Sequence, residues 1–423
     1  MSLHTYIHTE ETGVPWLGVI PRHWGVAPFK RLVDIQNGSD HKDVEQDDGY
    51  PVIGSGGPFA FADSYLYDGE SVLLGRKGTI DKPLYMNGRF WTVDTMYWSK
   101  IREDICGRYA YYTACTIPFE FYSTNTALPS MTKSVLNAHK VAFPPHSEQV
   151  AIAAFLDHET AKIDALIAEQ EKLLDLLAEK RQATISHAVT RGLNPDTEMK
   201  DSGVPWLGMV PAHWEMKRVK DCGCEVVDCK NRTPEAHPDG NYLVVRTSCV
   251  KDGQFNPESG YFTDEANFIE WTAKGMPRAG DVLFTREAPT GEACLAPVGI
   301  EFCLGQRMMY IRPPERVLLS EFLLYSIYGG LTRERISEKS KGSTVGHLRV
   351  GEVGELPLLL PQLDEQETLV AFVGKELSKI QVLAAASERA INLLNERRSA
   401  LIAAAVTGKI AVREHPSALM TAA

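Results

Sequence analysis

Gly13-Val14-Pro15-Trp16-Leu17-Gly18, near the start of the chain, recurs as Gly203-Val204-Pro205-Trp206-Leu207-Gly208. Each copy continues to a Pro-x-His-Trp segment, which occupies residues 21–24 in the first copy and 211–214 in the second. Two tryptophans and a histidine therefore repeat in the same register, which chance does not explain. An internal repeat of this kind indicates that the chain is a tandem duplication.

A second pair of matching segments predicts two long helices. The first opens with Ser147-Glu148-Gln149, contains no Gly or Pro up to residue 191, and has apolar residues at heptad spacing. The second opens with Asp364-Glu365-Gln366 and runs to residue 406 with a similar pattern, which only Gly374 interrupts. A helix as long as the first would span about 65 Å.

Each predicted helix carries an apolar stripe that a lone helix cannot bury. The simplest arrangement packs the two helices on each other as an antiparallel coiled coil, so that a pseudo-two-fold axis relates the two halves of the internal repeat. In the alternative arrangements, each helix packs on its own globular domain or on a second copy of the chain.

The segments between the repeated motifs predict two globular domains. Both are rich in Gly, Pro, Tyr and Trp and contain short β-like runs, at residues 71–74, 90–98, 242–245, 281–285 and 308–312. We therefore predict an α+β fold with two mixed α/β domains joined and separated by the long helices. The flanking motifs match while the middles differ, which is typical of a fixed framework carrying variable recognition loops. Two structural domains that have merely diverged are the alternative.

Composition limits the class of protein. The chain has 423 residues, 44% hydrophobic and 23% charged content, and a formal net charge of −11. No apolar run is long enough for a membrane helix, and the N-terminus does not have the pattern of a signal peptide. The eight cysteines form no regular framework. We expect a cytoplasmic protein without a membrane partner. Its acidity disfavours indiscriminate binding to nucleic acid, although residues 332–349 are locally basic.

The ordered double occurrence of these motifs resembles the specificity subunits of type I restriction-modification systems. The resemblance covers nearly the whole chain and includes the endings of both helix segments, Glu-Lys-Arg or Glu-Arg-Arg followed by Ala-Val-Thr. It implies two target-recognition domains, each recognising one half of a bipartite asymmetric sequence in double-stranded DNA. It also implies that the helices bind two methyltransferase (modification) subunits, and that restriction (translocase-nuclease) subunits join them.

The expected domain boundaries follow from the positions of these motifs. The chain divides into an N-terminal target-recognition domain, a first spacer helix, a second target-recognition domain, a second spacer helix and a C-terminal tail, at residues 1–145, 146–192, 193–361, 362–408 and 409–423.

The sequence gives little indication of chemistry within this chain. It contains no glycine-rich loop for a methyl donor and no phosphate-binding loop, since Gly408-Lys409 is followed by Ile410. A nuclease core near residues 195–217 is disfavoured by its spacing. Cys222, Cys224 and Cys229 match no familiar zinc module and are interpreted as buried thiols. We therefore expect a non-catalytic subunit with no cofactor and no metal.

Candidate DNA-binding residues lie in the dissimilar middles. Arg76 and Arg286 follow matching apolar strands, where an arginine can bind a phosphate or pair with guanine; a structural ion pair is the alternative. Further polar residues lie next to these arginines or in later loops that correspond in the two copies, and a solvated loop is the alternative for each. The full set is Arg76, Lys77, Thr79, Asn125, Lys133, Arg286, Lys339, Lys341, Ser343, His347 and Arg349.

Two further interpretations remain open. The chain could serve a fused methyltransferase-nuclease enzyme, or it could be a structural adaptor that bridges two proteins through its helices without contacting DNA. The repeated Trp16, His23 and Trp24 are the same in both halves, so they are assigned to packing of each domain on the helices rather than to base recognition.

Overall fold

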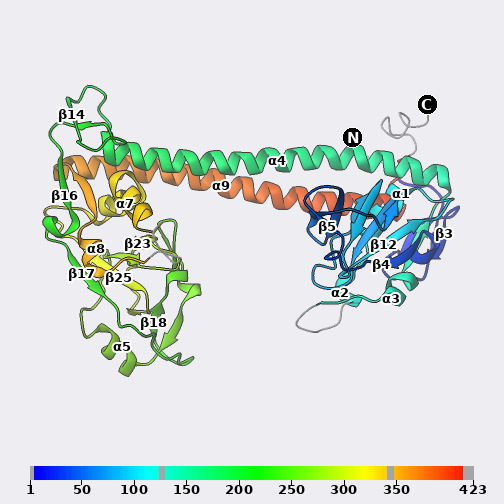
Figure 1. Ribbon diagram of the computed structural model, residues 1–423, viewed down its shortest axis with the longest axis horizontal. Helices are drawn as coiled ribbons and strands as arrows, with labels where there is room; N and C mark the ends of the chain where they lie inside the picture. Colours follow the sequence, from blue (N-terminus) through cyan, green and yellow to red (C-terminus); the bar gives the residue numbers. More distant parts are fainter. Residues whose placement is uncertain (1–3, 123–128, 341–346, 413–423) are drawn as a thin grey trace. The chain divides into compact units, whose positions relative to one another are not determined.

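The computed structural model describes residues 4–122, 129–340 and 347–412. They form two compact units (Figure 1). The first unit comprises residues 1–171 and 388–423, and the second comprises residues 172–387. Each unit is described by itself below.

Two long helices, α4 (His146–Arg191) and α9 (Leu363–Val406), each contribute one part to each unit. The N-terminal part of α4 and the C-terminal part of α9 belong to the first unit, where Arg398 of α9 forms an ion pair of 3.0 Å with Asp164 of α4. A left-handed glycine follows closely after each helix, Gly192 with φ 72° and Gly408 with φ 71°. Glycine adopts this conformation without a steric penalty, so these residues end the helices. Helix α9 continues through Gly374.

The described part of the first unit contains two larger sheets and two pairs of strands, β1 with β2 and β3 with β13. An antiparallel sheet has the order β10-β9-β12-β4, and a mixed sheet has the order β5-β7-β6-β11-β8, in which β6 and β11 are parallel. The strands are β1 Thr9–Glu11, β2 Val19–Pro21, β3 Gly25–Pro28, β4 Val33–Asn37, β5 Glu45–Gln46, β6 Tyr50–Gly54, β7 Gly57–Ala62, β8 Tyr67–Asp68, β9 Ser71–Gly75, β10 Leu84–Met86, β11 Arg89–Thr92, β12 Met96–Ile101 and β13 Lys140–Phe143. The short helices are η1 Phe29–Arg31, α1 Gly107–Ala114, α2 Phe119–Tyr122 and α3 Lys133–Ala138.

The second unit repeats this plan. Its antiparallel sheet has the order β17-β25-β22-β23, its mixed sheet has the order β21-β18-β24, and β18 and β24 are parallel. The strands are β14 Met199–Asp201, β15 Met209–Pro211, β16 Glu215–Arg218, β17 Glu225–Asp228, β18 Tyr242–Val245, β19 Val250–Lys251, β20 Gln254–Phe255, β21 Tyr261–Thr263, β22 Val282–Thr285, β23 Ala293–Leu295, β24 Phe302–Leu304, β25 Met308–Arg312 and β26 Pro357–Leu360. The short helices are η2 Val219–Cys222, η3 Thr247–Cys249, η4 Pro257–Ser259, α5 Glu265–Thr272, α6 Ser320–Tyr328, α7 Gly330–Ser340 and α8 Val350–Gly354.

The mixed helix and sheet content agrees with the predicted α+β class, and one predicted run needs correction. Residues 90–98 form no single strand, because the backbone turns after β11, where the Met96 N–H donates to the Val93 carbonyl at 3.0 Å. The two strands on either side of this turn, β11 and β12, belong to different sheets.

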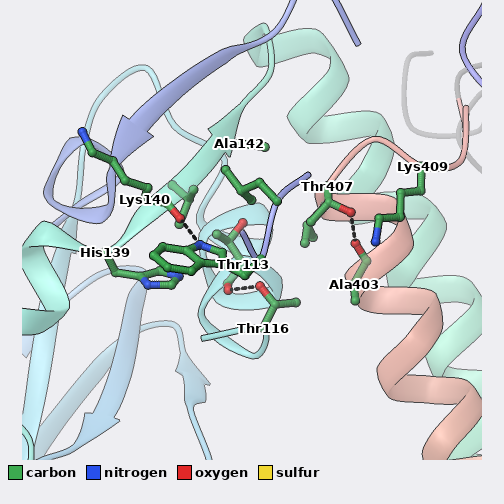
Figure 2. Close-up of a pocket in the computed structure, with 12 residues that line it drawn as sticks. Thr113, Thr116, His139, Lys140, Ala142, Ala403, Thr407 and Lys409 are labelled. Carbon is green, nitrogen blue, oxygen red and sulfur yellow. Dashed lines mark hydrogen bonds between the residues drawn. The ribbon is translucent and has the colours of Figure 1, made fainter. Parts of the chain in front are cut away.

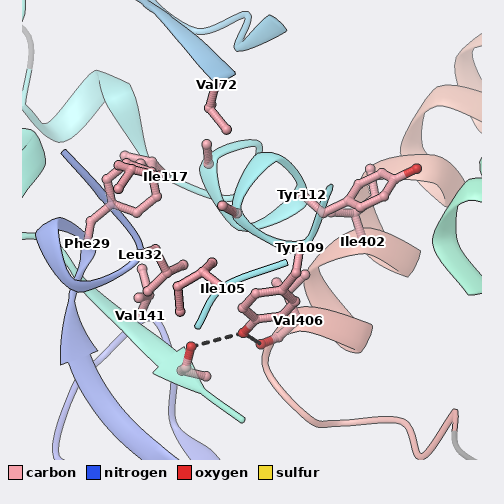
Figure 3. Close-up of a cluster of buried hydrophobic side chains, with 14 of the residues drawn as sticks. Phe29, Leu32, Val72, Ile105, Tyr109, Tyr112, Ile117, Val141, Ile402 and Val406 are labelled. Carbon is pink, nitrogen blue, oxygen red and sulfur yellow. Dashed lines mark hydrogen bonds between the residues drawn. The ribbon is translucent and has the colours of Figure 1, made fainter. Parts of the chain in front are cut away.

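The hydrophobic core of each unit includes side chains from both long helices. In the first unit, Phe155 and Leu156 of α4 and Ile402 and Val406 of α9 pack with the antiparallel sheet and α1 (Figure 3). In the second unit, Ile185 and Val189 of α4 and Leu369 and Val373 of α9 occupy the corresponding core. Neither helix therefore packs on a single globular domain alone.

A small cavity of about 90 Å³ lies in the first unit between β13, α1 and the end of α9 (Figure 2). Thr113, His139 and Thr407 contribute to its lining.

His139, beside this cavity, predicts a pH dependence of stability. Its ring stacks on Trp16 with 4.9 Å between ring centroids, its Nδ1 lies 2.9 Å from the Tyr122 hydroxyl, and burial lowers its pKa from 6.5 to about 4. As the pH falls from 6.5 towards 4, the unfolded chain takes up a proton that the folded chain does not, so we expect the first unit to lose stability in this range. The midpoint of urea-induced unfolding should depend less strongly on pH in His139→Gln than in the unaltered protein. An equal dependence in the variant and the unaltered protein would contradict this account.

Candidate nucleic-acid interface

The repeated motifs meet at the start of each long helix. In the first unit, the Glu148 carboxylate accepts hydrogen bonds from Trp24 Nε1 at 3.0 Å and from the Tyr6 hydroxyl at 2.9 Å, and His23 Nε2 lies 2.7 Å from it. In the second unit, the Glu365 carboxylate contacts Trp214 Nε1 at 3.0 Å and His213 Nε2 at 2.8 Å. These contacts explain why the histidine, the second tryptophan and the glutamate repeat together. The first tryptophan of each repeat is much more exposed than the second, because Trp16 and Trp206 are 42% and 52% exposed whereas Trp24 and Trp214 are buried.

The glutamine that follows each of these glutamates holds a second helix. Gln149 accepts a hydrogen bond from the Cys106 N–H at 3.0 Å, at the start of α1, and donates to the Pro144 carbonyl. Gln366 accepts from the Leu319 N–H at 2.9 Å, at the start of α6, and donates to the Pro361 carbonyl. The repeated Glu-Gln pair therefore belongs to the framework that both units share.

Loops at the end of strand β9 bring together several predicted DNA-binding residues of the first unit. The Met131 N–H donates to the Arg76 carbonyl at 2.9 Å, and Lys77 forms an antiparallel bridge with Ser130. This pairing places residues 76–79 beside the segment that leads into α3, where Lys133 is the first helical residue. Lys77 and Thr79 are exposed, and Lys133 is half-buried.

The second unit has the same backbone pairing at the end of strand β22. The Leu348 N–H donates to the Arg286 carbonyl at 3.0 Å, and Glu287 forms an antiparallel bridge with His347. The predicted correspondence of Arg76 with Arg286 therefore agrees with the backbone geometry. We call each pairing, residues 76–79 with 129–133 and residues 286–290 with 347–349, the strand-end loops of its unit.

The two arginines have different environments. Arg76 is half-buried, donates from Nη1 to the Asp94 carbonyl at 3.3 Å, and lies over the Tyr97 ring at 5.8 Å. Arg286 is only 9% exposed, and its Nε has no hydrogen-bond partner among the described residues. Neither arginine forms an ion pair with an acid in the part of the chain that the structure describes. A buried N–H without an acceptor is costly, so Arg286 Nε is suited to a ligand that offers an acceptor.

The remaining predicted residues divide into two groups. Lys339 forms an ion pair of 3.0 Å with Glu352, and the Arg349 N–H donates to the same carboxylate at 2.9 Å, at the start of α8. Asn125, Lys341 and Ser343 lie outside the described residues.

Two polar residues that sequence reasoning missed join the loops of the second unit. The Glu287 carboxylate lies 3.1 Å from Arg307 Nε and 3.2 Å from His347 Nδ1. Arg307 directly precedes β25, the strand that pairs with β22. A basic residue just before this strand is the sequence signal that could have identified Arg307.

The cysteines do not assemble a metal centre. No group of three or more His, Cys, Asp or Glu side chains suited to a metal ion occurs among the described residues. Cys222 and Cys229 are buried, Cys224 is half-buried, and burial raises the pKa of the Cys224 thiol to about 12. The described helices also include none long and apolar enough to cross a membrane.

Two copies of one framework that carry unlike polar loops define a class of internally duplicated two-domain protein. The family profile described as the type I restriction modification DNA specificity domain matches residues 21–175 and again residues 211–385. The chain therefore belongs to the family of type I restriction-modification specificity subunits.

Individual relatives are similar over most of their length. A putative type I restriction enzyme specificity subunit of Haemophilus influenzae is 23% identical over 77% of this chain and 79% of its own. The EcoDI specificity subunit of Escherichia coli is 20% identical over 93% of this chain and 90% of its own. A solved structure from work on complex assembly and conformational transition of the type I R-M system covers 92% of this chain and 99% of its own, with a TM-score of 0.67 and 14% identity, which supports the fold.

Proposed function

We propose that this chain is the subunit that recognises the DNA target of a type I restriction-modification complex, and that each unit recognises one half of a bipartite asymmetric sequence. The observation that carries the proposal is the pair of strand-end loops. Their backbone pairing is the same in the two units, while Lys77 and Ser130 in one correspond to Glu287 and His347 in the other. A constant scaffold with different polar groups suits recognition of two different base sequences.

The DNA-binding residues of the proposal are those of the strand-end loops. Arg76, Lys77, Thr79 and Lys133 act in the first unit, and Arg286, His347 and Arg349 act in the second, with Lys339 close to α8 on the same unit. Arginine and lysine supply the phosphate contacts and the contacts to guanine, and the neutral polar groups supply further hydrogen bonds. Asn125, Lys341 and Ser343 remain candidates from the sequence alone.

We assign the long helices to partner binding and spacing. The two helices form an antiparallel coiled coil that sets a constant gap between the half-sites, and they bind two modification subunits, to which restriction subunits are added. This chain contributes recognition and geometry without catalysis, and it acts in the cytoplasm. The expected domain boundaries, at residues 145, 192, 361 and 408, separate the recognition domains from these helices.

A domain exchange tests this function. The chain is co-expressed with its modification subunit in a host without adenine methylation, and methylated adenines are mapped across the genome. The unaltered chain should give a split motif with a constant gap. Replacing residues 25–143 with the corresponding domain of another family member should change one half of the motif and leave the other half and the gap intact.

The reciprocal exchange of residues 215–360 is the matched control, and it should change the other half only. A change in both halves after either exchange would contradict independent recognition by the two units. Complex formation without any sequence-specific methylation would favour the alternative of an adaptor that bridges proteins through its helices. The amino-acid sequence of the partner would show whether the partner is a fused methyltransferase-nuclease.

A further inference from the structure

Glu287, Arg307 and His347 form a connected cluster at the strand-end loops of the second unit. Glu287 holds Arg307 through one carboxylate oxygen and His347 through the other. The Glu287 side chain is 22% exposed, whereas those of Arg307 and His347 are 47% and 40% exposed. The acid is therefore the more buried member and the two basic groups are the more accessible members.

The engaged atoms determine what the cluster offers to a ligand. Arg307 uses Nε for Glu287, and its two terminal NH2 groups have no other hydrogen bond or ion pair among the described residues. Two adjacent NH2 donors held in one plane fit the O6 and N7 acceptors of guanine in the major groove. His347 uses Nδ1 for Glu287, so its Nε2 is the nitrogen left for a further contact.

The backbone around this cluster is held in an unusual conformation. Arg307 has φ 78° and Ala288 has φ 51°, and these are two of the three non-glycine residues with positive φ in the described part of the chain. The corresponding turn in the first unit contains a glycine, Gly78, with φ 81°. Such conformations in non-glycine residues are costly and cluster at ligand sites.

The first unit carries different chemistry at the same three places. The Arg76 N–H donates to the Thr95 carbonyl at 2.9 Å, and the Arg286 N–H donates to the Arg307 carbonyl at 2.9 Å, so Thr95 corresponds to Arg307. The two bridges pair Lys77 with Ser130 in the first unit and Glu287 with His347 in the second. Glu287, Arg307 and His347 of the second unit therefore correspond to Lys77, Thr95 and Ser130 of the first unit.

We propose that Arg307 is a specificity-determining residue that contacts a guanine in the half-site of the second unit, and that Glu287 is the positioning residue that fixes Arg307 and His347. This inference rests on the proposed function and extends it to residues outside the sequence-based set. Glu287 orients the guanidinium plane through Nε and, by holding His347 as well, keeps the loop that carries His347 beside it.

The test uses the complex of this chain with its modification subunit and the map of methylated adenines. Arg307→Asn removes the guanidinium and introduces a residue type that tolerates the positive φ of 78° at this position. It should remove the preference for one guanine in the half-site assigned to the second unit, with a 10- to 100-fold loss of discrimination, which is about 1–3 kcal/mol. The other half-site and the gap should not change.

Glu287→Gln tests the positioning role. It should relax the same base position by a smaller factor, while a purely structural role would lower the yield of folded complex and leave the base preference intact. Arg218→Ala is the matched control, because Arg218 is also an arginine paired with carboxylates in the second unit and is 48% exposed. Arg218→Ala should leave the motif unchanged.

The outcomes separate this inference from the proposed function. A bipartite motif with the unaltered chain and an identical motif with Arg307→Asn would overturn the role of Arg307 while leaving the function standing. Equal base preference in Glu287→Gln and the unaltered chain would overturn the positioning role. No bipartite motif with the unaltered chain in an assembled, active complex would overturn the function itself.

Discussion

Glu148→Ala is expected to lower the free energy of unfolding of the first unit by about 2–4 kcal/mol, because it removes a buried acceptor shared by the buried Trp24 Nε1–H, the half-buried Tyr6 hydroxyl and the His23 ring. The Glu148 side chain is 2% exposed and Trp24 is 3% exposed. Without the carboxylate, the nearly buried Trp24 Nε1–H loses its acceptor, and the start of α4 loses its link to the segment that carries the Pro-x-His-Trp motif.

Glu365→Ala is the matched control for this change. The Glu365 side chain is 29% exposed and contacts His213 and Trp214, so water can partly replace it, and the expected loss is smaller, about 1–3 kcal/mol. Amide hydrogen exchange separates the two units, since β3 and β13 report on the first and β16 and β26 report on the second. Equal effects of the two substitutions would contradict the dependence on burial.

Arg286→Met is expected to stabilise the second unit while weakening recognition of its half-site. The guanidinium of Arg286 is buried with an unpartnered Nε among the described residues, and an apolar side chain of similar length removes the cost of that burial. A buried N–H left without an acceptor costs about 1–3 kcal/mol, which sets the size of the expected stabilisation. Loss of an arginine contact to a base or phosphate should weaken specific binding about 10- to 100-fold.

The measurements are the thermal midpoint of the isolated chain and the binding of the assembled complex to a duplex that contains the mapped target. Arg76→Met in the first unit is the control, since that guanidinium has a carbonyl acceptor and lies over an aromatic ring. It should weaken binding without raising the thermal midpoint. A lower midpoint together with unaltered binding for Arg286→Met would assign Arg286 to the structural framework.

The opposite directions expected for stability and binding distinguish a binding residue from a structural one. Replacement of a structural residue lowers stability, whereas replacement of a binding residue that is held at a cost in free energy raises it, so the two measurements together are more informative than either alone. The positive φ of Arg307 likewise costs free energy in the unbound chain.

Several features follow from the sequence because they depend on local patterns. The apolar periodicity, together with the absence of Pro and with Gly374 as the one glycine in the two runs, predicted the long helices that are observed at His146–Arg191 and Leu363–Val406. The matched order of motifs predicted the duplication, and the apolar strands that precede Arg76 and Arg286 predicted their correspondence. Each of these inferences compares residues that are close in sequence or repeated in the same order, and such comparisons need no knowledge of long-range contacts.

The tertiary structure decided which distant residues meet. It divided the run at residues 90–98 between two sheets, joined Glu148 to Trp24, and brought Glu287 together with Arg307 and His347. The physical reason is that these contacts depend on strand pairing and loop closure between segments far apart in the chain, which no local periodicity specifies. The sequence by itself therefore determined the repeated framework and the places where the two units differ, whereas only the folded chain decided which of the differing side chains act together.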